Sequence, residues 1–363
     1  MIAGRQWDLV PALEGFPRFR DQWSVLSKSY GNHLLLDLDF VEPLIKYFAS
    51  SKTFLAVSRE NVPPSLVLLE EDRLGFWHTF QPSQAPIGLL LLSPEVPPTQ
   101  QIDDLIRSLP GYVLGVSLMQ QDPEFSGFLR ELLPGHCEVL DYIPTARLTV
   151  SGTFEEYWSQ RSKNLTHNLE RQRRRLAGKG MRLELHVDRD PQKVVECIAD
   201  YGKLEGAGWK GELGTAIVPE NVQGQFYTEL LQRFCERGEG VIYRLKCDGQ
   251  TIASDLCIQR NGTMIVLKIT YDEGLKGVSS SLLIREEIVQ RLFNEHDIQV
   301  VEFYGRVRDW HRKWTNEIRS MFHVNVYRNT LVSHGKHHFK KAIECFQGRK
   351  KRGLQNSSSG SPA

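Results

Sequence analysis

The fold is decided by a stretch in the second half of the chain. Residues 240–304 read GVIYRLKCDGQTIASDLCIQRNGTMIVLKITYDEGLKGVSSSLLIREEIVQRLFNEHDIQVVEFY. Three runs rich in β-branched and apolar residues lie at 241–245, 251–258 and 264–271. They are separated by Asp248-Gly249 and Asn261-Gly262, and such dipeptides are the strongest short-range signals for a β-hairpin. The sequence therefore predicts an antiparallel meander of three strands.

A helix follows the meander and begins in a run of small residues. Ser279, Ser280 and Ser281 precede an apolar pattern that continues to Phe293, and a further strand follows. The first N–H groups of a helix have no partner within it and, together with the helix dipole, attract an anion. The three serines are therefore a candidate phosphate site, although serine is also a favoured N-cap residue of ordinary helices.

Composition limits the class of protein. A chain of 363 residues predicts about two domains, and 40% hydrophobic residues are enough for packed cores. The net charge of +1 argues against nucleic-acid binding by the whole surface. The longest apolar run, residues 87–92, is too short to span a membrane, and the first residues lack the apolar core of a secretory signal. Six cysteines without a Cys-x-x-Cys pair fit a reducing cytoplasm, which is the predicted location.

The first part of the chain repeats the order of elements found in the second. Short apolar runs lie at residues 54–57, 65–69, 74–77 and 87–92, followed by a predicted helix at 100–109, a strand at 112–118, a helix at 124–133 and a strand at 137–140. We therefore predict an α/β (α+β) protein with two similar domains, residues 1–150 and 151–332, each a twisted mixed β-sheet flanked by helices. Residues 333–363 start basic and become rich in Ser and Gly, which predicts a largely disordered tail.

The second predicted domain opens with a helix. Thr153 and Glu156 form a capping box, and the helix is expected to continue to about residue 177. A strand at 181–187, helices at 191–205 and 226–237, a helix at 310–318 and a strand at 321–327 complete the prediction.

Several segments of this domain, taken in order, carry a family resemblance. They are the basic helix at 161–176, the Trp-containing segment 205–211, the strand segments 248–253 and 268–272, and the strand end 302–306 followed by 311–314. They resemble the acetyltransferase domain of cellulose-biosynthesis proteins of the CelD/BcsL type, a branch of the GNAT superfamily. Fem-type aminoacyltransferases are related and pair two such domains in one chain.

The resemblance implies tandem GNAT-like domains, of which the N-terminal one is degenerate. It also implies an acyl-CoA-dependent N-acyltransferase that moves the acyl group of acetyl-CoA, or of another acyl-CoA, to an amine of a polysaccharide or cell-envelope precursor. One departure stands out, because the family has Ser-Pro-Gly where this chain has Val278-Ser279-Ser280. Glycine lets a backbone approach phosphate closely, whereas serine keeps its N–H and adds a hydroxyl donor. The anion site is retained, and its cofactor need not be acetyl-CoA itself.

The resemblance assigns roles to individual residues. The expected acyl-CoA contacts are Lys268, Ile269, Thr270, Ser279, Ser280 and Ser281. Acyl transfer to an amine needs a base for the amine and a proton donor for the leaving thiolate. Glu205 and Asp255 are the candidate bases and Tyr271 the candidate thiolate donor. The alternatives are surface charges for the two acids and an aromatic packing residue for Tyr271.

Basic and aromatic residues near the predicted site are candidates for contact with the acceptor. They are Trp209, Lys210, Arg306, Lys313 and Trp314. The alternative for the last two is a solvated amphipathic helix that Trp314 anchors in the core.

Two further hypotheses remain open. The basic helix within residues 161–182 suggests tRNA or another polyanion as a partner, as in a Fem-like transferase that uses aminoacyl-tRNA, although a charged helix is more often a solvated face. The missing glycine suggests a non-catalytic GNAT fold that acts as a partner in exopolysaccharide biosynthesis. Metal ligation is not expected, because His334, His337 and His338 lie in the predicted tail and no metalloprotease or phosphate-loop motif is present.

Overall fold

A computed structural model describes residues 6–59, 63–72, 75–207, 216–275 and 277–334. The described strands are β1 (Trp7–Pro11), β2 (Thr53–Ser58), β3 (Leu66–Glu71), β4 (Phe76–Thr79), β5 (Leu90–Leu91), β6 (Gly115–Gln121), β7 (Cys137–Thr149), β8 (Leu183–Asp188), β9 (Gly240–Cys247), β10 (Gln250–Arg260), β11 (Thr263–Tyr271), β12 (Val300–Phe303) and β13 (Glu317–Tyr327). The described α-helices are α1 (Ala12–Gly15), α2 (Arg20–Ser29), α3 (Leu38–Phe48), α4 (Pro98–Ser108), α5 (Phe154–Ser159), α6 (Lys163–Gly178), α7 (Val194–Ala207), α9 (Val222–Glu236) and α10 (Ser280–Glu295).

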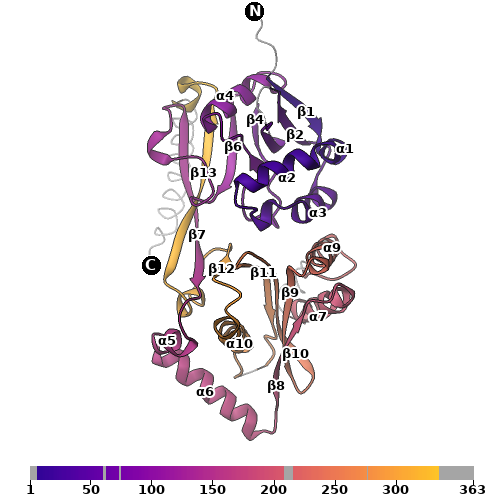
Figure 1. The fold of residues 1–363 in the computed structure, drawn as a ribbon, viewed down its shortest axis with the longest axis vertical. Coiled ribbons are helices and arrows are strands. Elements are labelled where there is room, and N and C mark those ends of the chain that lie inside the picture. Colours follow the sequence, from indigo (N-terminus) through magenta and orange to yellow (C-terminus); the bar gives the residue numbers. More distant parts are fainter. Residues whose placement is uncertain (1–5, 60–62, 73–74, 208–215, 276, 335–363) are drawn as a thin grey trace, which may run out of the picture.

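All these strands belong to one mixed sheet, which runs the length of the molecule (Figure 1). Its order is β1-β2-β3-β4-β6-β13-β7-β12-β11-β10-β9-β8, and β5 pairs with β3. In each half, an antiparallel meander is followed by a helix and a strand parallel to the last meander strand. These are β2-β3-β4, α4 and β6 in one half, and β9-β10-β11, α10 and β12 in the other. The predicted mixed α/β fold with flanking helices is confirmed, and the two sheets that the sequence predicted are the two halves of one continuous sheet.

The two halves share strands. β13, at the end of the described chain, pairs antiparallel with both β6 and β7 and so completes the sheet of the N-terminal half. β7 pairs with β13 along most of its length, and its last residues pair with β12. The sheet is continuous across residue 150, and the domain limits given above stay a prediction.

The predicted turns of the central meander are confirmed. Asp248 and Asn261 have φ values of 49° and 50°, and the glycines that follow them have φ values of 84° and 75°. Two consecutive residues with positive φ make a type I′ turn, whose twist matches that of the flanking strands.

Helices cover both faces of the C-terminal half. α7 and α9 pack on one face in a core that they share with α1, α2 and α3 of the N-terminal half. α5, α6 and α10 pack on the opposite face around Trp314 and Phe293. A third core lies between α4 and the N-terminal part of the sheet.

Three of the predicted helices need correction. The helix expected at 153–177 is two helices, because Ser162 caps a new start at α6 by accepting the N–H of Leu165. The capping box of Thr153 and Glu156 at α5 is confirmed. The helix expected at 124–133 is wrong, since that segment contains only a 3-10 turn at Arg130–Leu132.

The helix expected at 310–318 is also wrong. Only a 3-10 turn at His311–Lys313 forms there, and β13 begins at Glu317. The Thr315 hydroxyl accepts the N–H of Glu317, a donor that a continuing helix would need, and the His311 ring accepts the N–H of Arg308 just before the turn.

Candidate functional site

The sheet opens between two parallel strands in the C-terminal half. β11 pairs with β12 only over Thr263, Met264 and Ile265. From Val266 to Tyr271, that edge of β11 has no partner strand among the described residues. The register of β11 against β10 shifts after Leu256, and such a bulge increases the local twist. The geometry leaves a splayed edge beside α10.

A cavity of about 190 Å³ lies at this edge. It is lined by Asp255, Ile269, Thr270, Tyr271, Ser281, Leu282, Ile284, Arg285 and Trp310. Tyr271 is 40% exposed, whereas Asp255 and Arg285 are 1% and 3% exposed. The cavity therefore leads from the surface near Tyr271 to a buried inner end at Asp255 and Arg285.

The backbone of β11 presents a free N–H to the open edge. Asp272 donates its N–H to the carbonyl of Ile252 at 2.8 Å, so these two residues form a hydrogen-bonded pair of the antiparallel ladder between β10 and β11. Hydrogen-bonded and non-hydrogen-bonded pairs alternate along such a ladder. Ile269 lies opposite Asp255 at a position where the peptide groups point away from β10. Its carbonyl oxygen lies 3.0 Å from the hydroxyl of Tyr201, which confirms that direction. The N–H of Ile269 has no acceptor among the described residues.

The inner end of the cavity is a buried ion pair. Arg285 on α10 lies 2.5 Å from the Oδ2 atom of Asp255 on β10. Burial raises the pKa of Asp255, and the charge and hydrogen bond of Arg285 oppose that rise. The guanidinium also lies over the rings of Phe303 and Trp310, at 5.1 and 5.7 Å from their centroids.

A side chain of α6 binds one of the backbone donors at the start of α10. Ser279 donates its N–H to the side-chain oxygen of Gln172 at 2.6 Å, and the Gln172 amide donates back to the Ser279 hydroxyl at 3.2 Å. Among the described residues, nothing accepts from the N–H of Ser280 or Ser281, and the buried Ser280 hydroxyl has no partner. Two of the three predicted anion donors are therefore available.

Arg175 of α6 also reaches this turn. Its guanidinium lies 3.4 Å from the carbonyl oxygen of Gly277. Arg175 is exposed and has no ion pair with a described residue. A cation thus stands at the mouth of the site, beside the positive end of α10.

Glu205 lies on the opposite face of the sheet, on α7, and is 4% exposed. Its carboxylate accepts the N–H of Ile217 at 2.9 Å and lies 3.1 Å from the Tyr201 hydroxyl. Tyr201 in turn reaches the carbonyl of Ile269 at the open edge. Burial, followed by the charge of Glu205, raises the pKa of Tyr201 well above its usual range. Glu205 is therefore connected to the cavity through one hydroxyl.

The structure brings together only part of the predicted set. Asp255, Ile269, Thr270, Tyr271 and Ser281 line one cavity. Lys268 does not line it, since its ammonium lies over the Tyr227 ring on the face of α7 and α9. Roles for these residues stay predictions.

The predicted acceptor contacts are more scattered. Arg306 and Lys313 are exposed in the segment between β12 and β13. Trp314 is fully buried and packs 6.0 Å from Trp158, so it has no exposed surface. Trp209 and Lys210 lie outside the described residues.

Sequence reasoning missed three residues of the site, namely Gln172, Tyr201 and Arg285. Arg285 follows the apolar residues Leu282-Leu283-Ile284 and precedes two glutamates, so the charge pattern of α10 did not single it out. Gln172 occupies a core-facing position of α6, in register with Leu165, Leu169 and Leu176. Nothing in the local sequence singles out Tyr201.

Comparison with known proteins agrees with this geometry. The family described as "Acetyltransferase (GNAT) domain" matches residues 163–312, so this part of the chain is similar to GNAT acetyltransferase domains. The region matched contains α6, α7, α9, α10 and the strands β8 to β12. None of the curated proteins is detectably similar in sequence to the chain.

Solved structures share the fold of both halves. FemX is similar with a TM-score of 0.53 at 9% identity, and the match covers 85% of this chain and 96% of FemX. L-PGS from Bacillus licheniformis gives a TM-score of 0.51 at 12% identity, covering 85% of this chain and 92% of that one. A conserved protein of unknown function from Bacteroides thetaiotaomicron gives 0.52 at 11% identity, covering 85% and 96%. These identities are low, so the similarity concerns the fold.

Two negative findings apply to the described residues alone. No group of three or more His, Cys, Asp or Glu side chains there could hold a metal ion. Within the same ranges, every helix is too short or too polar to cross a membrane.

Proposed function

We propose that the chain transfers an acyl group from an acyl-CoA to an amine, on an acceptor such as a polysaccharide or cell-envelope precursor. The observation that carries the proposal is the cavity at the unpaired edge of β11, beside the start of α10. An extended pantetheine arm can add to such an edge through backbone hydrogen bonds, as a peptide does in β-augmentation. The free N–H groups of Ser280 and Ser281, with Arg175, offer donors to the pyrophosphate.

The reaction follows from the groups at the cavity. The amine attacks the thioester carbonyl carbon, and the N–H of Ile269 is placed to stabilise the oxyanion that develops. The C–S bond then breaks, and Tyr271 at the cavity mouth would protonate the leaving thiolate. The amine proton would pass to Glu205 or to Asp255.

The surroundings of the two acids differ. Asp255 is held by Arg285 at the closed end of the cavity. Glu205 lies 3.1 Å from the Tyr201 hydroxyl, which would give its own proton to Glu205 and take up the proton of the amine. We therefore favour Glu205 as the base.

Binding of acyl-CoA tests the proposal directly. Isothermal titration of the full chain with acetyl-CoA, longer acyl-CoAs and free CoA should show binding, and Tyr271→Phe should keep the affinity while lowering turnover about tenfold. Glu205→Gln should lower turnover more than Asp255→Asn. Absence of binding to every acyl-CoA would refute the proposal, and binding without turnover on any amine would favour a non-catalytic partner.

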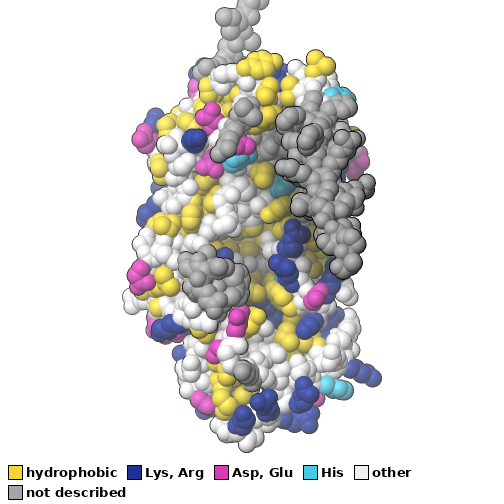
Figure 2. Space-filling view, turned by 180° about the vertical axis from the view of Figure 1, so that it is seen from behind, with side chains coloured by type: hydrophobic (Ala, Val, Ile, Leu, Met, Phe, Trp, Pro, Cys, Tyr) yellow, Lys and Arg dark blue, Asp and Glu magenta, His cyan; other side chains and the backbone are white. Residues whose placement is uncertain are grey.

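A second candidate function is transfer from aminoacyl-tRNA. The observation that favours it is the exposed basic surface of α6, formed by Arg171, Arg174, Arg175 and Lys179. Figure 2 shows Lys and Arg side chains gathered at the lower end of the molecule, where Figure 1 places α6 and β8. Phosphate contacts supply most of the affinity of a protein for nucleic acid.

The structure selects the residues for a test of this candidate. Arg173 binds Glu286 and Glu287 and must be left intact. The triple variant R171E/R174E/R175E should abolish salt-sensitive tRNA binding in a filter assay, whereas the equally charged control R18E/K28E/K52E in the N-terminal half should not. Equal binding by the two variants would refute tRNA as the donor.

A further inference from the structure

Arg285 differs from the other arginines of the interior in its partners. Arg244 is equally buried and binds three carboxylates, while Arg319 binds two. Arg285 is 3% exposed and binds Asp255 alone. Its buried Nε has no hydrogen-bond acceptor. Guanidinium groups carry five donors, and this one uses a single donor on an anion.

Arg285 itself borders the cavity. Arg285 and Asp255 both line it, and Phe303 and Trp310 flank the charge with aromatic rings that cannot accept a strong hydrogen bond. A buried donor left without an acceptor is unfavourable, so the site as it stands favours an incoming anion. The pair itself fixes the orientation of the guanidinium, and two parallel N–H groups on one side match a carboxylate.

The position along the cavity indicates which part of a substrate meets Arg285. The outer end, at Tyr271 and Ser281, adjoins the start of α10, where the phosphates would bind. The inner end lies opposite Ile269, the residue whose N–H would face the reacting carbonyl. A group that reaches Arg285 therefore lies beyond the thioester, on the acyl chain.

We infer that the inner end of this cavity binds a carboxylate carried by the transferred acyl group, so that the donor is a short dicarboxylic acyl-CoA. This inference rests on the proposed acyl-CoA function. A cavity of about 190 Å³ admits a chain of a few carbons and no long fatty acyl group.

The test compares donors that match in size and differ in charge. Full-length protein is titrated calorimetrically, without acceptor, with succinyl-CoA and glutaryl-CoA and with the apolar counterparts butyryl-CoA and valeryl-CoA. Succinyl-CoA or glutaryl-CoA should bind roughly tenfold more tightly than its apolar counterpart. Because no acceptor is present, a carboxylate on the acceptor cannot produce this difference.

A double variant then assigns the preference to the ion pair. R285Q/D255N removes both charges together, which avoids an uncompensated buried aspartate. It should lose the preference for succinyl-CoA over butyryl-CoA. The control R319Q/D122N alters another buried pair, away from the cavity, and should keep the preference.

The outcomes separate the inference from the function on which it rests. Equal affinities for charged and apolar donors, or a preference that survives in R285Q/D255N, would overturn the inference and leave acyl-CoA binding in place. If no acyl-CoA binds at all, both fall. If R285Q/D255N does not fold, R285K serves instead: a single ammonium cannot bind a second carboxylate in the same bidentate way, so the preference should fall several-fold. An unchanged preference in R285K would contradict the inference.

Discussion

The two halves of the sheet have the same strand order around a helix and differ at the edge beside that helix. In the C-terminal half, β11 continues for six residues beyond its last pairing with β12 and borders a cavity of about 190 Å³. In the N-terminal half, β4 has only four residues, and three of them pair with β6. After β4 the chain leaves the sheet, and the segment around Gly88 returns to cover the free edge of β6.

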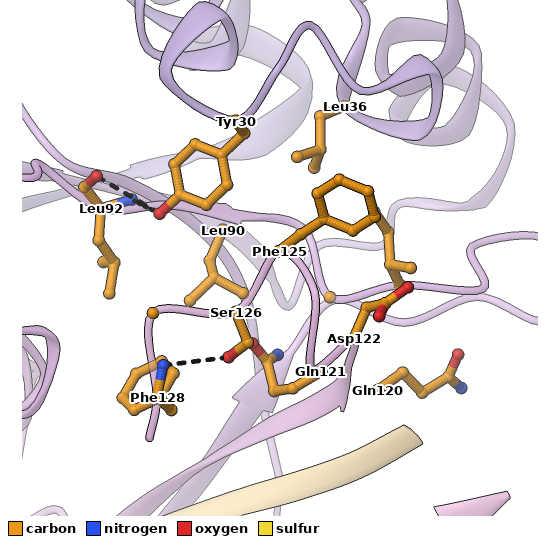
Figure 3. Close-up of a pocket in the computed structure, with 13 residues that line it drawn as sticks. Tyr30, Leu36, Leu90, Leu92, Gln120, Gln121, Asp122, Phe125, Ser126 and Phe128 are labelled. Carbon is orange, nitrogen blue, oxygen red and sulfur yellow. Dashed lines mark hydrogen bonds between the residues drawn. The ribbon is translucent and has the colours of Figure 1, made fainter. Parts of the chain in front are cut away.

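Residues after β4 fill the equivalent opening. Gly88 donates its N–H to the carbonyl of Gln120 at 3.1 Å and so covers the free edge of β6. Beside it, the Tyr30 hydroxyl meets the Leu92 backbone, as Figure 3 shows. The cavity that remains is about 30 Å³, a space for one or two waters.

The helices also start differently. α4 begins after Pro97 with Pro98 and has no side-chain cap. Proline has no N–H, so at the surface groove of about 480 Å³ over Pro98 the start of α4 lacks the donor that Ser280 offers at the start of α10. The comparison shows that topology alone does not make a site of this kind. The C-terminal half has both an unpaired strand edge and free N–H groups at the helix start, whereas the N-terminal half has a covered edge and a proline at the helix start.

The largest effect should come from removing the backbone N–H that the open edge of β11 presents to the cavity. Ile269→Pro removes the N–H that faces the cavity and leaves the ladder between β10 and β11 intact, because that N–H does not point toward β10. We expect turnover to fall about 100-fold, the usual cost of losing one oxyanion donor, with a modest change in donor affinity. Single-turnover kinetics with saturating acyl-CoA measures this effect.

Thr270→Pro is the matched control, since the N–H of Thr270 pairs with Ser254 in the ladder. That variant should unfold at lower urea concentration, whereas Ile269→Pro should stay close to the parent protein. Normal turnover in a folded Ile269→Pro variant would show that the edge of β11 plays no part in the reaction.

The sequence predicted the meander and its helix because local signals sufficed there. Asp248-Gly249 and Asn261-Gly262 specify type I′ turns, and apolar periodicity marks α10. What it did not predict depends on contacts between distant segments. The insertion of β13 beside β6 joins residues about 200 positions apart, and the bond between Gln172 and Ser279 joins two helices 107 positions apart.

The failed helices have a similar cause. The segments at 124–133 and 310–318 have helical composition, and tertiary contacts overrode it. The side chains of Glu124 and Asp122 are held by Arg147 and Arg319, both on strands of the shared sheet. The sequence leaves open whether Trp314 contacts the acceptor or anchors the core, and the fold shows that it packs in the core.

The junction between the halves should respond to acid. His33 of the N-terminal half lies 2.9 Å from the Tyr304 hydroxyl of the C-terminal half. Burial lowers its pKa to about 4, with the charge of Asp122 opposing and that of Arg319 adding to the effect. An unfolded histidine titrates near pH 6.5, so the unfolded state binds a proton first as the pH falls.

Stability should therefore fall by roughly 3 kcal/mol between pH 6.5 and pH 4 through this group alone. His33→Gln cannot titrate, and its free energy of unfolding should depend less on pH over the same range. Urea denaturation of both proteins at several pH values gives the difference. Parallel pH profiles would show that His33 is not buried as a neutral group at the junction.

One added side chain should displace the segment that covers the free edge of β6 in the N-terminal half. A Cβ at Gly88 would lie 2.6 Å from the carbonyl oxygen of Met119 and 2.5 Å from the Gln121 amide, so Gly88→Val must displace the covering segment. We expect a loss of roughly 2 kcal/mol in the free energy of unfolding and no change in acyl-CoA affinity. Gly135→Ala meets no atom within 4 Å and serves as the control. Weaker donor binding in Gly88→Val would mean that the two halves do not act separately.

The smallest effect concerns Gln172, whose side chain accepts the Ser279 N–H and so makes it unavailable to a phosphate. Gln172→Ala removes the acceptor of the Ser279 N–H, costs about 1 kcal/mol of stability, and returns a third donor to the phosphates. Acyl-CoA affinity should then rise about threefold, the effect of one weak additional hydrogen bond. Gln172→Glu keeps an acceptor at the same place and adds a negative charge, so affinity should fall by a similar factor. Calorimetry with free CoA measures both changes. If affinity rises in Gln172→Ala and falls in Gln172→Glu, the pyrophosphate binds at this turn. If both variants bind CoA as the parent protein does, the pyrophosphate binds elsewhere. The unpaired edge of β11 would then be the one difference between the two halves that bears on donor binding.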